Sequence, residues 1–243
     1  MIVLPDLDED HHVHSVFSDD AVSTLDQNVR AAGWRGLRVI CFADHVRRDS
    51  PWVADYTTAV AALRPVPGLE VVAGVEAKIL DSRGRLDLPE RLPGVGRVLI
   101  ADHQFPGAAG PVHPRDIRAQ LTAGQRTAAE VIDGLISATA RALDQVASPQ
   151  LAHLFSLLPK MGLAESDVPG PALAQLARAA SRAGARLEVN EKWACPSGRT
   201  IRAFAAAGVP LVPSTDSHDC ADVGQYAKVR DLLAAAADSQ VPG

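Results

Sequence analysis

Histidine and acidic residues stand at the ends of short apolar runs along much of the sequence. Such runs are VICFADH, LEVVAGVE, RVLIADH, QLAH and VPLVPSTDSH, which end at His45, Glu76, His103, His153 and His218. Imidazole and carboxylate groups are side chains that bind zinc, manganese and iron in proteins. The pattern therefore predicts chemistry that depends on bound divalent metal ions.

Two pairs of residues have a spacing that fixes their direction. His12 and His14 are two residues apart, as are Asp216 and His218. Residues i and i+2 of a strand share one face, so each pair points to one side, whereas His11 points to the other. If parallel strands close into a barrel, their carboxyl ends meet at the rim where barrel enzymes place their sites. We expect the histidines and acids to meet there; the alternative is a set of hydrogen-bonded polar strand ends.

A metal centre explains how so many titratable groups share one pocket. Neighbouring carboxylates raise one another's pKa and buried imidazoles resist protonation, but divalent cations remove both difficulties. Three ions would contribute about +6, whereas Asp19, Glu76, Asp216 and a bridging hydroxide would contribute about −4, leaving about +2. A phosphate dianion matches that charge. No cysteine falls in the pattern, which disfavours a thiolate zinc site.

The apolar runs alternate with longer stretches that are rich in Ala and Leu. The predicted strands are a short segment with His12–His14 and then Val39–Phe42, Leu69–Val75, Arg97–Ala101, Gln150–Phe155, Arg186–Val189 and Val209–Pro213. The predicted helices are Thr24–Ala32, Ala54–Leu63, Thr127–Val146, Pro171–Ala183, Thr200–Ala207 and Tyr226–Ala237. This alternation indicates an α/β fold with parallel strands joined by crossover helices. About seven such units predict a closed or nearly closed barrel, with residues 1–243 as one domain.

Two segments do not fit the alternation. Gln104–Gln125 and Leu157–Pro171 are rich in Gly and Pro and are predicted to be irregular. Irregular loops of a barrel are commonly found near its active face. We therefore expect these two segments to select the substrate.

The composition restricts the class of protein. With 47% hydrophobic residues and a net charge of −5, the chain can build a core and carries no basic stripe for long nucleic acids. Its three cysteines are odd in number and form no close pair, which disfavours a disulfide framework and favours the cytoplasm. No apolar run reaches the roughly 20 residues of a membrane span. The sequence leaves the oligomeric state open.

The opening of the chain and the later strand ends together resemble one known family. DHHVHSVFSDD (Asp10–Asp20) resembles the D-x-H-x-H-[ST]-x-x-S-D motif of the PHP (polymerase and histidinol phosphatase) superfamily. The segments ADH, GVE, DH, AH and TDSH then follow in the order of that family, as far as His218. The resemblance implies a distorted seven-stranded, TIM-like β/α barrel with two or three divalent ions of Zn, Mn or Fe.

The same resemblance implies a set of metal ligands. Glu76 would bridge two metals, and Glu76, Asp216 and His218 would be the catalytic residues. Asp20 is placed as well as Asp19 to be a ligand, and Asp102 either supports a ligand or points away from the pocket. The ligands implied are His12, His14, Asp19, His45, Glu76, His103, His153, Asp216 and His218.

Basic residues just beyond the predicted strand ends are candidates for substrate contacts. Arg47, Lys78, Lys192 and Arg199 occupy such positions, where each could contact phosphate or be a solvated surface charge. Arg199 is favoured because PSGRT is predicted to begin a helix, whose N–H groups attract anions. The substrate-binding prediction comprises Arg199, Lys78 and Arg47. His113 is expected on the surface or in a lid.

The function predicted from these residues is hydrolysis of a small-molecule phosphate monoester, as in a histidinol phosphatase. A metal-bridging hydroxide would attack phosphorus in line, without a covalent enzyme intermediate. One alternative is a phosphodiesterase or exonuclease acting on nucleotides, and another is a metal-binding module without catalysis. An amidohydrolase acting on a C–N bond is a further enzyme alternative.

Overall fold

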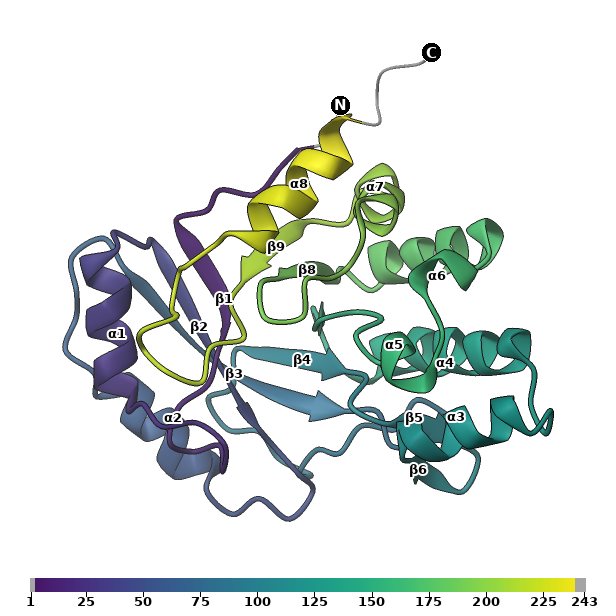
Figure 1. Cartoon of the computed structure of the whole chain (residues 1–243). Helices are drawn as coiled ribbons and strands as arrows, with labels where there is room; N and C mark the ends of the chain where they lie inside the picture. The colour runs from purple at the N-terminus through teal and green to yellow at the C-terminus, as the bar shows by residue number, and fades with distance from the viewer. Residues whose placement is uncertain (1–2, 239–243) are drawn as a thin grey trace.

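The computed structural model of the chain describes residues 3–238, and a curved sheet of parallel strands forms its centre (Figure 1). Within those residues the sheet has seven strands in the order β1-β2-β3-β4-β7-β8-β9, and each adjacent pair is parallel. The strands are β1 (Glu9–Val13), β2 (Val39–His45), β3 (Glu70–Lys78), β4 (Arg97–Ala101), β7 (Gln150–Leu151), β8 (Arg186–Asn190) and β9 (Leu211–Ser214). The predicted α/β architecture is therefore confirmed.

The sheet curves until its first and last strands meet. Beyond the end of β9, the backbone N–H of His14 donates to the carbonyl of Ser217 at 2.9 Å. The buried carboxylate of Asp10 in β1 accepts from the backbone N–H of Thr215 at 2.9 Å and from its hydroxyl at 2.6 Å. It also accepts from the N–H of Gly224 at 2.9 Å. These bonds join the two edges, and the barrel is nearly closed, as the sequence predicts.

Helices cover the outside of the barrel (Figure 1). They are α1 (Leu25–Trp34), α2 (Val53–Ala61), α3 (Pro114–Thr122), α4 (Ala128–Ala142), α5 (Leu158–Met161), α6 (Gly170–Arg182), α7 (Gly198–Ala206) and α8 (Lys228–Asp238), with 3-10 turns at Leu143–Gln145 and Glu165–Asp167. Thr24 and Thr127 begin α1 and α4 with reciprocal capping hydrogen bonds, which satisfy N–H groups of the first turn. Among the described residues, no helix has both the length and the apolar character needed to cross a membrane.

Buried apolar residues form two separate clusters. The larger buried side chains, such as Phe42 and Tyr56, belong to the main core cluster that includes the helices. Ala43, Leu99 and Ala101 form a separate small cluster with Ala152. Because alternate strand residues share a face, Ala43 and Ala101 lie on the same face as the residues two positions later, which are histidines. Small side chains thus leave space for polar groups at the barrel end.

The segment Gln104–Gln125 is not the irregular loop that its Gly and Pro content predicts. It contains a hairpin of β5 (Phe105–Gly107) and β6 (Gly110–Val112), followed by α3. Gly110 begins β6 directly after the hairpin turn with φ +141°, and Pro114 is the first residue of α3, where a missing N–H costs nothing. Gly and Pro residues of this segment stand at ends of the hairpin strands and at the start of α3. The prediction of an irregular segment was therefore wrong.

Candidate metal centre

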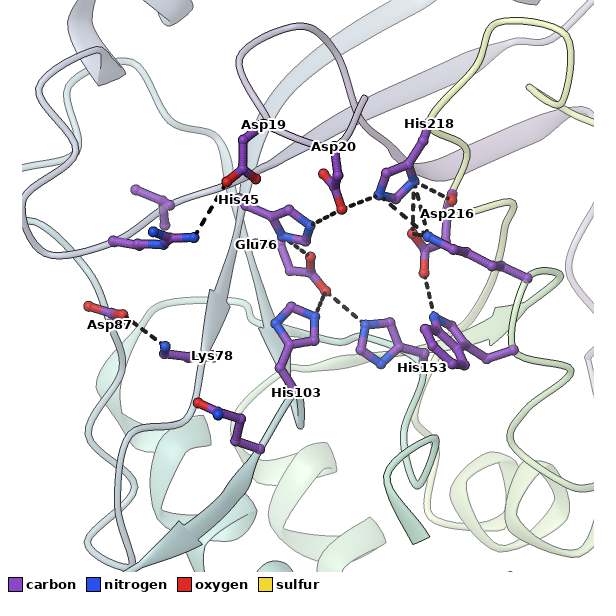
Figure 2. Close-up of a pocket in the computed structure, with 15 residues that line it drawn as sticks. Asp19, Asp20, His45, Glu76, Lys78, Asp87, His103, His153, Asp216 and His218 are labelled. Carbon is purple, nitrogen blue, oxygen red and sulfur yellow. Dashed lines mark hydrogen bonds and ion pairs between the residues drawn. The ribbon is translucent and has the colours of Figure 1, made fainter. Parts of the chain in front are cut away.

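The carboxyl ends of the strands bring the predicted histidines and acids around one cavity of about 390 Å³ (Figure 2). Each residue lies within a strand near its end or in the first residues after it. Figure 2 shows side chains from β2, β3 and the segments after β4, β7 and β9 pointing toward one another. The residues gathered at this end are His12, His14, His45, Glu76, His103, His153, Asp216 and His218.

Glu76 occupies the centre of this cluster and is buried. Its Oε1 lies 2.8 Å from His153 Nε2 and 3.2 Å from His103 Nε2. Its Oε2 lies 2.7 Å from His45 Nδ1 and 3.7 Å from His12 Nε2. Within residues 3–238, however, no donor meets the directional requirement for a hydrogen bond to Oε2. One carboxylate oxygen therefore faces several imidazoles without a hydrogen bond.

A second carboxylate approaches the first two histidines. His12 Nε2 and His14 Nε2 lie 3.0 Å apart, and Asp216 Oδ1 lies 3.3 Å from His14 Nε2. Burial would raise the pKa of Asp216, but the surrounding imidazoles hold it below its usual value. In the described part of the chain, donor atoms within 4.8 Å of one another form the groups His14–His45–His218, His12–His14–Asp216 and His45–Glu76–His103.

The outer nitrogen of His12 is held by an acidic residue, and that of His14 by a hydroxyl that an acidic residue orients. Glu188 Oε2 lies 2.9 Å from His12 Nδ1, and an ionised carboxylate can only accept, so Nδ1 carries the proton. His14 Nδ1 lies 3.2 Å from the hydroxyl of Ser18, which donates to Asp44 at 2.8 Å. That hydroxyl must then accept from His14 Nδ1. In the neutral tautomers, both Nε2 lone pairs therefore face the cluster.

His153 is held in the same way. Its Nδ1 lies 3.1 Å from the hydroxyl of Ser156, which donates to Asp102 Oδ1 at 3.2 Å. Asp102 is thus a supporting group for His153, which settles the two alternatives left by the sequence. The sequence analysis missed Ser156 and also Asp44, although Asp44 and Asp102 stand in the two ADH segments. An acid directly before His45 and before His103 is the signal that could have found Asp44.

The arrangement fits divalent cations. Two imidazole lone pairs 3.0 Å apart repel each other unless a proton or a cation lies between them. The buried oxygen of Glu76 that accepts no hydrogen bond points toward the same histidines. Imidazole nitrogens with carboxylate oxygens are the donor set of zinc, manganese and iron. The described residues can therefore hold metal at the place that the sequence predicts.

Without cations, protons must balance the buried negative charge. Burial would raise the pKa of Glu76, but His103 and His12 hold it well below its usual value. Burial opposes a proton on His153 also, but hydrogen bonds to nearby carboxylates raise its pKa to about 10. Burial together with the charge on His12 lowers the pKa of His14 to about 3. The cluster thus divides into imidazoles that hold a proton and imidazoles that do not.

Two of the clustered residues adopt a backbone conformation that is rare outside glycine. His153 has φ +29° and Asp216 has φ +54°, in the left-handed region. Each follows the end of a strand, and the predicted strand Gln150–Phe155 ends at Leu151 because the chain turns at once. Non-glycine residues in this region cost of order 1–3 kcal/mol and are concentrated at functional sites. The turn directs His153 toward Glu76 (Figure 2). It directs Asp216 toward His14.

Asp20, rather than Asp19, reaches the histidines. Asp20 Oδ2 lies 3.5 Å from His45 Nε2 and 3.2 Å from His218 Nε2. The side chain of Asp19 is 78% exposed and points to Arg47, at 3.7 Å (Figure 2). The sequence-based choice of Asp19 is therefore corrected to Asp20. Strand periodicity does not extend into this loop, so sequence spacing could not distinguish the two.

Substitution of Asp20 by asparagine is expected to lower metal content and activity, because the amide removes the negative charge that lies beside His45 and His218. We expect a loss of about 10- to 100-fold in metal affinity. The matched variant Asp19→Asn is expected to remain within about twofold of wild type. Titration of each purified variant with Mn²⁺ measures the difference. Equal losses in both variants would contradict this placement.

The predicted substrate contacts are divided between the cavity and another region. Lys78 and Arg47 line the cavity, although each faces a carboxylate at 3.7 Å, from Asp87 and Asp19 respectively. Arg199 is absent from the described cavity lining, and its guanidinium donates to the carbonyl of Val168 at 2.9 Å. The prediction that Arg199 binds substrate was wrong because α7 directs this side chain toward a neighbouring backbone segment.

Lys192 is the basic residue nearest to the cluster. Its Nζ lies 3.4 Å from Asp216 Oδ1 and 3.2 Å from His218 Nδ1. Lys192 was one of several candidates in the sequence, and the structure places its ammonium group at the cavity.

His11 lies outside the cavity lining. Its ring binds Glu9 at 2.8 Å and Arg97 at 2.6 Å.

Substitution of Glu188 by glutamine is expected to weaken metal binding by about 10- to 100-fold, the usual effect of removing a supporting hydrogen-bond partner. The carboxylate fixes the tautomer of His12, whereas an amide can present either a donor or an acceptor to Nδ1. Isothermal titration with Mn²⁺ would measure the change. Glu191→Gln, three residues further along the chain, is the control, because the Glu191 carboxylate accepts from the backbone N–H groups of Ala227 and Lys228 instead. An unchanged affinity in Glu188→Gln would show that the hydrogen bond does not orient His12.

Comparison with known proteins gives matches in both sequence and structure. The family model described as PHP domain matches residues 10–156. A probable phosphatase of Caldanaerobacter subterraneus subsp. tengcongensis is 38% identical over 85 residues, a segment that spans 34% of this chain and 34% of that protein. A probable phosphatase of Acetivibrio thermocellus is 25% identical over 234 residues, which cover 92% of this chain and 85% of that protein.

A solved structure has the same fold. It is the histidinol phosphate phosphatase of Lactococcus lactis subsp. lactis, complexed with zinc, L-histidinol and phosphate. The two structures align with a TM-score of 0.64 over 96% of this chain and 94% of that chain, at 14% sequence identity. At this identity the similarity establishes the barrel fold alone.

Proposed function

This chain belongs to the PHP domain family, and from that premise we propose that it is a metal-dependent phosphatase of small-molecule phosphate monoesters. One observation carries the proposal: the Nε2 lone pairs of His12 and His14 and a carboxylate oxygen of Glu76 without a hydrogen bond face one another at the barrel end. Relatives named probable phosphatases support it, as does a fold neighbour that holds zinc and phosphate.

The proposal assigns the clustered residues to two or three divalent ions of zinc, manganese or iron. His12, His14 and Asp216 would hold one ion, and His103 with His153 another, with Glu76 shared between them. A third would lie against His45, His218 and Asp20. When bound, such ions supply positive charge for phosphate oxygens and lower the pKa of a water molecule so that it can attack phosphorus.

Residues of this chain would position the substrate around that centre. Lys192 presents its ammonium group at the cavity, beside Asp216 and His218, where it can attract a phosphate oxygen as a point charge. Trp193 Nε1 donates to Asp216 Oδ2 at 2.8 Å, which leaves Oδ1 directed toward His14. The cavity of about 390 Å³ has the size of a small-metabolite site.

Removal and restoration of metal would test the proposal. The protein would be stripped with chelator, reconstituted with Mn²⁺ or Zn²⁺, and assayed for phosphate release over a panel of phosphorylated metabolites. We expect turnover only after reconstitution. Undiminished turnover in chelator would reject a metal-dependent mechanism. Faster cleavage of a cyclic nucleotide or dinucleotide than of a nucleotide monophosphate would favour a diesterase, and tight metal binding without hydrolysis of any ester would favour a non-catalytic module.

A further inference from the structure

A second cavity of about 390 Å³ lies directly beside the candidate metal centre. His103 and Gln104 line both cavities, so the two are neighbours across these side chains. The remaining lining of the second cavity comes from the start of α3 and from α5, which lie side by side (Figure 1). Its described lining residues are His103, Gln104, His113, Pro114, Arg115 and Lys160.

The lining of the second cavity is cationic. It contains Lys160 and Arg115 and, in the described part of the chain, no carboxylate. Lys160 Nζ lies 3.9 Å from the ring centroid of Trp193, and Lys160 forms no ion pair within residues 3–238. Because Trp193 donates to Asp216, the Lys160 ammonium group is separated from the metal centre by one aromatic ring. This charge is available to a ligand that reaches across from the first cavity.

The other polar groups of the second cavity are also donors. The Nδ1 atom of His113 accepts from the N–H of Arg115 at 3.1 Å, so the neutral ring keeps its proton on Nε2. Arg115 has one contact with the exposed carboxylate of Asp116, at 3.6 Å, which leaves most of its guanidinium donors free. Together with the amide of Gln104, the cavity offers hydrogen-bond donors and positive charge to a ligand.

Two cations that line only the first cavity differ in this respect. Lys78 faces Asp87 and Arg47 faces Asp19, each at 3.7 Å, so each cation has an adjacent acid. Lys160, on the side of the second cavity, forms no such pair with an acid within residues 3–238. A substrate that occupies both cavities would therefore place a negative group near Lys160.

We propose that the substrate is a phosphate monoester with a second anionic group, a carboxylate or another phosphate, that binds against Lys160 and Arg115. This inference rests on the proposed phosphatase function, because the ester phosphate would occupy the metal centre while the second anion occupies the second cavity. A substrate with an ammonium group at that position, as in an amino alcohol phosphate, would be repelled. The specificity would thus differ from that of an enzyme for histidinol phosphate, whose organic part carries an amine.

Three phosphate monoesters with a three-carbon chain would test the charge preference. They are the phosphate ester of 3-hydroxypropionate (3-phosphopropionate), propyl phosphate and 3-aminopropyl phosphate. With the metal-loaded protein, kcat/KM is expected to fall in that order, by about tenfold from the anionic to the neutral compound, as two partly exposed ion pairs would produce. In Lys160→Met with Arg115→Met, the ratio of kcat/KM for 3-phosphopropionate over propyl phosphate is expected to fall about tenfold. The matched control Arg118→Met, on α3 but outside the described cavity lining, is expected to keep the wild-type ratio.

Reversal of the charge at position 160 is expected to shift the substrate preference toward the compound with an ammonium group. Lys160→Glu should raise kcat/KM for 3-aminopropyl phosphate relative to 3-phosphopropionate by more than the neutral substitution does. Equal values for the three compounds in wild type, or an equal loss for all of them in the Lys160 variants, would overturn the proposal, since the lysine would then act on the shared ester phosphate. Affinities of the same compounds, measured by calorimetry, distinguish a failure of the phosphatase proposal from a failure of the proposed anionic subsite. The expected affinity order without any phosphate release would overturn the phosphatase function alone, whereas equal affinities or no binding would overturn the second anionic subsite.

Discussion

Replacement of Glu76 by glutamine is expected to lower kcat/KM for phosphate release by about a thousandfold, because several kcal/mol of charge stabilisation depend on the metal ions that it would share. Its two oxygens face His153 and His103 on one side and His45 on the other, at 2.7–3.2 Å. An amide retains the shape of the side chain but offers one acceptor and no negative charge. Elemental analysis of the purified variant is therefore expected to show fewer bound ions.

Asp19→Asn is the matched control for this experiment. It makes the same change of carboxylate to amide at the cavity, but at a side chain that is 78% exposed and apart from the histidine cluster. Activity and metal content in this control are expected to stay within about twofold of wild type. If Glu76→Gln retained full activity with full metal content, Glu76 would not be a bridging ligand and the assignment of the centre would fail.

The barrel could be predicted because its strands have a strong local signal. Buried parallel strands are read as continuous apolar runs, and the run Arg97–Ala101 coincides with β4. The signal fails where a strand is short, as in β7, which ends at Leu151 although the apolar run continues to Phe155. It also fails between β4 and α4, where Gly and Pro indicate turns without showing which elements the turns connect.

The cluster could be predicted because its members stand at strand ends, and parallel strands end at one rim. The groups that orient them are harder to find. Glu188 lies inside β8 and contacts His12 from across the barrel, and such a contact depends on closure instead of on local spacing. Asp20 and Lys192 lie in loops, where the alternation of faces no longer applies. Sequence could thus identify the cluster but not all of the residues that support it.

Substitution of Asp10 by asparagine is expected to destabilise the metal-free protein by about 3 kcal/mol, because a buried backbone donor would lose its acceptor. Asp10 is fully buried, and each of its oxygens accepts a backbone N–H, from Thr215 on one side and Gly224 on the other. Either orientation of an asparagine amide would place its NH₂ group against one of these donors. Thermal unfolding is expected at a midpoint roughly 6–12 °C lower. In the matched control Asp8→Asn, which alters an exposed contact with Arg38, the midpoint should change by less than about 2 °C.

The same variant tests whether closure of the barrel also shapes the metal centre. Asp10 joins β1 to the segment after β9, and these two regions carry His14 and Asp216, whose nearest ligand atoms lie 3.3 Å apart. If loss of the Asp10 hydrogen bonds loosens the junction between β1 and the segment after β9, metal will bind the variant more weakly. Metal will then stabilise the variant less than it stabilises wild type. The difference in unfolding midpoint between wild type and Asp10→Asn should therefore be larger with saturating Mn²⁺ than in chelator. An equal difference under both conditions would mean that Asp10 holds the barrel closed without ordering the ligands.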